Sequence, residues 1–111
     1  MSKGYSLENV NELSGGDDEF IAVLVQTFLE EIPPDLQGMV EAIEANNPAQ
    51  AYQFAHKMKP NLQLFGIDLL AEIKGVEAWS KTGQGKETIQ PTLDHIVKLV
   101  SAAIEDLKQD F

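Results

Sequence analysis

Apolar residues recur at intervals of three and four along most of the chain, the spacing of one face of an α-helix. No segment alternates apolar and polar residues as a half-buried strand does. The chain is therefore expected to be all-α. The apolar positions of its longest periodic stretch are Ile21, Val25, Phe28, Ile32, Leu36, Met39 and Ile43.

A short helix is expected ahead of this long one. Residues 6–13 begin with a serine, carry apolar residues at every third position, and are followed by Gly15-Gly16, which is a common helix stop. Such a segment is long enough to cover one end of a larger helical body.

The long helix has a clear start and a disturbed middle. Asp17-Asp18-Glu19 places negative charge where a helix N-terminus favours it. Pro33-Pro34 lies inside the periodic stretch, and each proline lacks the backbone N–H of a regular helix. Since the apolar stripe keeps its phase across the pair, a kinked or briefly broken helix is expected.

Three further helices follow. Asn47 is a candidate N-cap with Pro48 at the first helical position, and Gly66 closes that segment. Another helix starts near Asp68, and a turn at residues 81–86 separates it from the last. The inward positions of these helices are Ala51, Phe54, Ala55, Met58, Leu62, Phe65, Leu70, Ile73, Val76, Ile89, Leu93, Ile96, Val97, Val100, Ala103, Ile104 and Leu107.

Four amphipathic helices joined by short loops bury their apolar faces most simply as an antiparallel up-down four-helix bundle. The additional short N-terminal helix completes this expected fold. At 111 residues, the chain fits a single domain spanning residues 1–111.

The amino-acid composition excludes several kinds of functional site. The absence of cysteine excludes a disulfide framework, a thiolate zinc site and a cysteine nucleophile, and it is compatible with a reducing compartment. The start of the chain lacks the apolar region of a signal peptide, and the longest apolar run, residues 20–25, is far too short to span a membrane. A cytoplasmic protein with no membrane association is expected.

Charge argues against nucleic acid as a partner. Eight lysines, no arginine and 18 acids leave a net charge of −10, which repels a phosphate backbone. The charge is uneven: residues 1–55 carry ten acids and one lysine, whereas residues 56–81 carry four lysines and three acids. This positive segment begins at a histidine.

His56 points roughly 140° away from the apolar stripe of its helix, with Lys57 and Lys59 close by. No other histidine or acid stands at a metal-ligand spacing from it, and the chain has no G-x-S-x-G nucleophile motif. An outward imidazole beside ammonium groups suits a phosphoryl group. An exposed histidine with no chemical role remains the plain alternative, and it is the expected reading for His95.

The run from Ala55 to Lys59 (A-H-K-M-K), with Gly66 ten residues after the histidine and Leu69-Leu70 beyond it, resembles the signature of histidine-containing phosphotransfer (HPt) domains. The resemblance implies that His56 accepts and donates phosphate through Nε2, with electrostatic help from Lys59 and a further contribution from Lys57. It implies a packing role for Gly66.

The resemblance also implies the partners and the place of the protein in signalling. Phosphate comes from the aspartate of a receiver domain, in a response regulator or a hybrid sensor kinase, and passes to another receiver in a two-component phosphorelay. Mg²⁺ belongs to the receiver, and this chain needs no cofactor. The resemblance implies a phosphocarrier and not a kinase, and the sequence carries no nucleotide-binding motif that would indicate otherwise. Its expected docking residues are Tyr52, Gln53, Pro60, Gln63 and Leu64.

One residue departs from the family pattern: Pro60 stands where a glycine usually follows the lysine. Its missing N–H frees the carbonyl of His56, which leaves the rate of transfer open.

Two other functions remain open. A non-phosphorylated helical adaptor would bind a receiver or another protein through the same face that carries His56. The chain could also be a piece of a larger sensor kinase, although its start at Met1 and its end soon after the last helix favour a free module.

Overall fold

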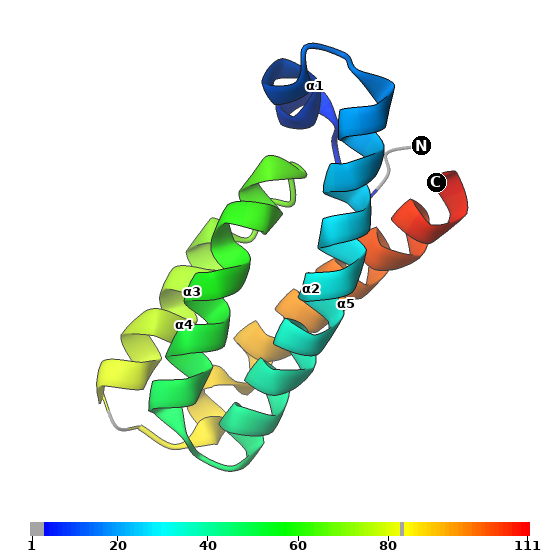
Figure 1. The fold of residues 1–111 in the computed structure, drawn as a ribbon. Helices are drawn as coiled ribbons and strands as arrows, with labels where there is room; N and C mark the ends of the chain where they lie inside the picture. Colours follow the sequence, from blue (N-terminus) through cyan, green and yellow to red (C-terminus); the bar gives the residue numbers. More distant parts are fainter. Residues whose placement is uncertain (1–3, 83) are drawn as a thin grey trace.

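The structure is a computed structural model that describes residues 4–82 and 84–111. In these residues all regular secondary structure is helical, which confirms the all-α prediction. Gly83, in the expected turn at residues 81–86, lies outside the described residues. The helices are α1 (Glu8–Ser14), α2 (Asp18–Glu44), α3 (Pro48–Leu64), α4 (Leu70–Thr82) and α5 (Lys86–Asp110) (Figure 1).

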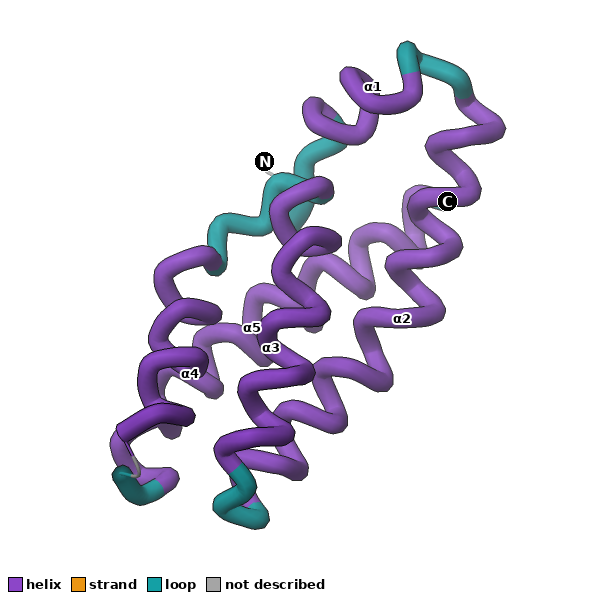
Figure 2. Tube along the Cα trace, turned by 60° about the vertical axis from the view of Figure 1, so that its left-hand side comes forward, coloured by secondary structure: helices purple, strands orange, loops and turns teal. Residues whose placement is uncertain are grey.

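Each of the four longer helices packs against two of the others. α2 contacts α3 and α5, and α4 contacts the same two helices, while α1 rests on α2. The molecule is elongated, 45 × 24 × 21 Å, and the turn between α2 and α3 lies at the end opposite α1 (Figure 2). None of the helices in the described ranges offers an apolar stretch of the length that crossing a lipid bilayer requires.

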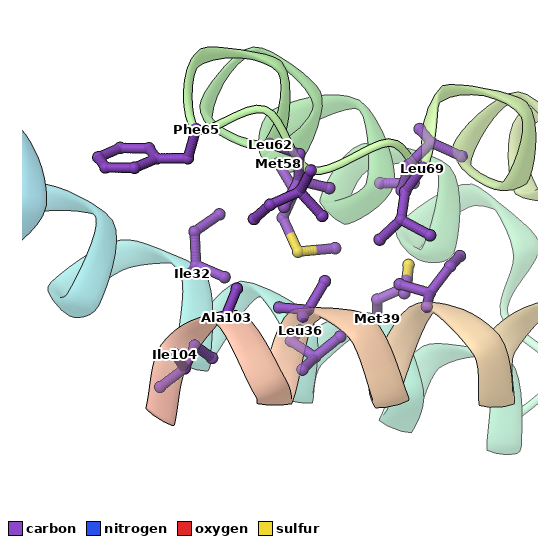
Figure 3. Packing of buried hydrophobic residues seen from close by; sticks show 14 of the residues in the cluster. Ile32, Leu36, Met39, Met58, Leu62, Phe65, Leu69, Ala103 and Ile104 are labelled. Atoms are coloured by element: carbon purple, nitrogen blue, oxygen red, sulfur yellow. The ribbon is translucent and has the colours of Figure 1, made fainter. Parts of the chain in front are cut away.

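The core is built from most of the apolar positions that the periodicity predicts. The inward position predicted for Leu70 is wrong, because this side chain is exposed at the start of α4. All seven predicted positions of α2 are buried, and the side chains from α2, α3 and α5 meet between the helices (Figure 3). Phe28 and Phe65 pack with ring centroids 4.7 Å apart. Fully burying a side chain of this size contributes about 1.5–3 kcal/mol, so this shared core fixes how α3 is held.

The predicted helix starts are confirmed. The Asp17 side chain accepts hydrogen bonds from the backbone N–H groups of Glu19 and Phe20, which satisfies two donors at the start of α2. The Asn47 side chain accepts from the N–H of Gln50, and Pro48 occupies the first turn of α3.

Of the two outcomes expected at Pro33-Pro34, a kink or a brief break, the break does not occur, because α2 continues through both prolines. Ile32 and Leu36, on either side of the pair, are both buried in the core. Burial of the stripe on both sides therefore offsets the hydrogen bonds that the prolines remove. α3 likewise continues through Pro60.

The boundary between α3 and α4 lies close to its predicted place. α4 begins at Leu70, and the expected start was Asp68 or its neighbours. Gly66 follows the end of α3 and adopts a left-handed conformation with φ of 66°, which favours glycine. A Cβ built there would lie 2.7 Å from Ser6 Cβ. Gly66 thus permits close approach of the N-terminal segment, and not of a neighbouring helix.

Candidate functional site around His56

α3 carries His56 on its outer side, as the helical position predicts. The neighbouring Ala55 and Met58 are fully buried, whereas the His56 side chain is 63% exposed. Its Nδ1 lies 3.2 Å from Oε2 of Glu77, which α4 contributes. The imidazole is therefore held at one nitrogen by the adjacent helix and is open to solvent.

Glu77 joins His56 to Lys59. Its second oxygen, Oε1, accepts a hydrogen bond from Lys59 Nζ at 3.0 Å. Positions separated by three residues lie on the same side of a helix, so α3 presents both groups to one carboxylate. The Glu77 side chain is only 14% exposed, which strengthens these charge-assisted contacts relative to fully solvated ones.

The pKa of Glu77 follows from these contacts. Burial by itself raises it, but the hydrogen bonds from Lys59 and His56, together with their positive charge, outweigh burial and hold the pKa below its usual 4.5. Glu77 is thus ionised at neutral pH. An ionised carboxylate only accepts hydrogen bonds, so it favours the tautomer with the proton on Nδ1 of His56 and the lone pair on Nε2.

The predicted docking residues lie along the same side of α3. The rings of Tyr52 and His56 are nearly parallel, 5° apart, with centroids separated by 5.8 Å. Gln53, Pro60 and Gln63 are exposed, as a docking role requires. A further candidate, Leu64, is half-buried and packs against the core, so it only borders this surface.

The structure places Lys57 apart from His56, Lys59 and Glu77. Its Nζ lies 3.2 Å from Oδ1 of Asp35 on α2, the opposite neighbour of α3. The Lys57 side chain is 62% exposed and that of Asp35 only 6%. The other oxygen of Asp35, Oδ2, is buried without a hydrogen-bond partner in the described part of the chain.

Sequence reasoning missed both carboxylates. Glu77 lies 21 positions after His56 in the chain, and its spacing to His56 is not that of any motif. The available indication was its place on α4 among the lysines of the positive segment. For Asp35 the indication in the sequence was weaker, because a carboxylate next to two prolines is expected to be exposed to solvent.

Three large apolar side chains are exposed that the sequence did not single out: Leu13 of α1, and Phe20 and Val23 of the first turns of α2. Individual exposed apolar residues are ordinary on a protein surface and by themselves mark no site.

The remaining titratable groups give no second site. His95 is exposed, and its Nε2 lies 3.6 Å from Glu72. Across residues 4–82 and 84–111, no three histidine, cysteine, aspartate or glutamate side chains are placed to hold one metal ion.

No family model, no curated protein and no solved structure matches this chain. Its function is therefore inferred from the residues and their geometry.

Proposed function

We propose that the protein is an HPt domain: a cytoplasmic phosphorelay intermediate that accepts a phosphoryl group on His56 from a receiver-domain aspartate and passes it to another receiver. One observation carries the proposal. The exposed His56 ring is held at Nδ1 by the same ionised carboxylate, Glu77, that holds Lys59. This arrangement leaves Nε2 as the free nucleophile, next to a cation suited to phosphoryl oxygens.

The proposed fold is an antiparallel up-down four-helix bundle made of α2–α5, with α1 as an additional short helix and the whole chain as one domain. The pairwise packing of the four longer helices supports it. In such a bundle α3 is a rigid helix that holds His56 in a fixed position. Since in-line transfer depends on the positions of the reacting groups, this rigidity supplies much of the catalysis.

The chemistry is a balanced exchange of one bond for another. The lone pair on Nε2 attacks the phosphorus of the aspartyl phosphate, and an N–P bond forms while the P–O bond to the aspartate breaks. The bonding electrons leave with the aspartate as a carboxylate. The proton on Nδ1 stays in its hydrogen bond to Glu77, whose charge offsets the positive ring. Transfer onward to a second receiver is the reverse reaction.

Lys59 is proposed to stabilise the transferring group. Its ammonium shares the carboxylate of Glu77 with the His56 ring, and from there it is proposed to turn toward the phosphoryl oxygens as negative charge gathers on them. The chain itself is proposed to need no cofactor, because the Mg²⁺ that neutralises the acyl phosphate belongs to the receiver.

The receiver is proposed to dock over the outer side of α3. Gln53, Pro60 and Gln63 are exposed there, and the ring of Tyr52 lies beside that of His56. This surface carries no carboxylate of its own, so it does not repel the anionic donor.

A non-phosphorylated adaptor is the second candidate function. In this alternative a receiver or another protein binds the same outer side of α3, where Gln53, Pro60 and Gln63 are exposed, without any chemistry at His56. Such an adaptor binds its partner equally well after His56→Gln.

The test is phosphoryl transfer from a panel of purified receiver domains, charged with radiolabelled acetyl phosphate and Mg²⁺. We expect label on this chain that is labile in acid and stable in alkali, as a phosphoramidate is. His56→Gln removes the label, while the matched variant His95→Gln retains it. A wild-type chain that no receiver labels, or label that persists in His56→Gln, contradicts the proposal.

A further inference from the structure

Two lysines of α4 have a different environment from those of α3. Lys57 and Lys59 of α3 are each bound to a carboxylate of a neighbouring helix. Lys74 and Lys81 are exposed, and neither pairs with a carboxylate within the described part of the chain. The free positive charge of the lysine-rich segment therefore lies on α4.

In the described residues neither acid of α4 forms an ion pair with these lysines. Glu72 faces His95 of α5, and Glu77 faces α3. The outward surface between them carries small or apolar exposed side chains. With the two lysines, we define the α4 face as Leu70, Ala71, Lys74, Ala78 and Lys81.

The α4 face borders the histidine site. Glu77 is three residues after Lys74 and four before Lys81, so it lies at the edge of the same helical face. Its carboxylate in turn contacts His56. α4 runs alongside α3 in both views of the chain (Figures 1 and 2), so a protein that reaches His56 also passes over the α4 face.

The opposite flank of His56 has the reverse charge. α2 carries seven acids and no lysine between Asp18 and Glu44. An anionic protein that approaches α3 is therefore repelled on the α2 side and attracted on the α4 side. Charges arranged in this way steer association and set orientation.

We infer that the α4 face is a docking surface for the acidic flank of the phosphoryl donor. This inference rests on the proposed function. The phosphoryl group of the donor and the carboxylates that bind its divalent cation together carry more negative charge than the cation offsets, so the donor surface around the reacting group stays anionic. The alanines permit close approach, while Lys74 and Lys81 attract the donor and orient it over His56.

The test compares two double charge reversals with the same change in net charge. Lys74→Glu/Lys81→Glu alters the α4 face, and Lys98→Glu/Lys108→Glu alters two exposed lysines of α5. The second-order rate constant of transfer from a phosphorylated receiver is measured at about 20 mM and about 500 mM NaCl, where screening differs strongly. Phosphoramidate, a small donor without a protein surface, labels both variants in parallel.

At low salt we expect the α4 variant to react about 10- to 100-fold more slowly than wild type, and the α5 variant to change by less than about 3-fold. The difference should shrink at high salt, and phosphoramidate should label both variants as it labels wild type. Equal rates for the two variants at low salt, with His56 labelled, overturn the α4 inference alone. If neither donor labels His56 in the wild-type chain, the proposed function fails and this inference fails with it.

Discussion

α3 carries two lysine–carboxylate pairs, one on each side, and they differ in what else they touch. The Lys57–Asp35 pair faces α2, with an exposed ammonium and a buried carboxylate that has one oxygen unpartnered in the described residues. The Lys59–Glu77 pair faces α4 and shares its carboxylate with His56. Distance along the chain is therefore a poor guide to which lysine acts with His56. Lys57 is the nearer lysine in sequence, but it pairs on the other side of α3 from Glu77.

The difference has a simple geometric cause. Adjacent residues on a helix point about 100° apart, whereas residues three apart lie about 60° from each other. Lys57 therefore turns to α2, and Lys59 stays on the His56 side. Mutations in the two pairs are therefore expected to differ in their effects on the rate of phosphoryl transfer and on the free energy of unfolding.

The largest expected effect separates the two lysines. Lys59→Ala should slow phosphoryl transfer to His56 on the order of 100-fold, because it removes the cation that stabilises the transferring group. Lys57→Ala should change the rate by less than about 2-fold, since Lys57 pairs with Asp35 on the α2 side and not with the carboxylate that contacts His56. Rapid-quench measurement of labelled protein gives both rates. Equal losses in the two variants would remove the distinction between the pairs.

A smaller effect separates the two carboxylates. Glu77→Gln should slow transfer about 10-fold, because the amide no longer offsets the positive ring or selects the Nδ1–H tautomer. Asp35→Asn is the matched control and should leave the rate within about 2-fold. The same quench assay reads both variants. A wild-type rate in Glu77→Gln shows that the carboxylate has no part in the reaction.

Stability should respond in the opposite order. Asp35→Ala removes a buried oxygen without a hydrogen-bond partner, and we expect the free energy of unfolding to rise by about 1 kcal/mol. Glu77→Ala leaves Lys59 unpaired, and we expect a loss of about 1 kcal/mol. Urea unfolding followed by circular dichroism measures both. Destabilisation by Asp35→Ala would mean that its pair with Lys57 outweighs the burial of the free oxygen.

The smallest effect is the pH dependence of the Glu77 contribution. Because folding lowers the pKa of Glu77 from 4.5, the ionised carboxylate stabilises the fold above that pH. This contribution declines as the pH falls through the lowered value. The difference in urea midpoint between wild type and Glu77→Gln should therefore be largest near neutrality and shrink below about pH 4.5. A difference that stays constant down to pH 3 contradicts the assigned ion pair.

The sequence predicts the helices well because the helical pattern is local and repeated. The spacing of Phe28, Met58 and Ile96 places each in the core, and the caps at Asp17 and Asn47 mark helix starts from a few residues alone. The brief break that the local rule allows at Pro33-Pro34 does not occur, because the apolar positions on both sides of the prolines are buried.

The site was only partly predictable for a related reason. The outward position of His56 follows from its own helix, and so does the position of Lys59. Glu77 reaches them from α4, and no local pattern encodes which side chains of two packed helices meet. Asp35 is hidden from sequence reasoning in the same way, since only the packing of α2 on α3 buries it.

Nitrogen-15 NMR of the phosphorylated chain, with labelled histidine, tests the central claim most directly. Coupling to phosphorus identifies which ring nitrogen of which histidine carries the phosphoryl group. We predict that it is Nε2 of His56, with the proton retained on Nδ1 and with His95 unchanged. A phosphoryl group on Nδ1 of His56, on His95 or on no histidine would contradict the account.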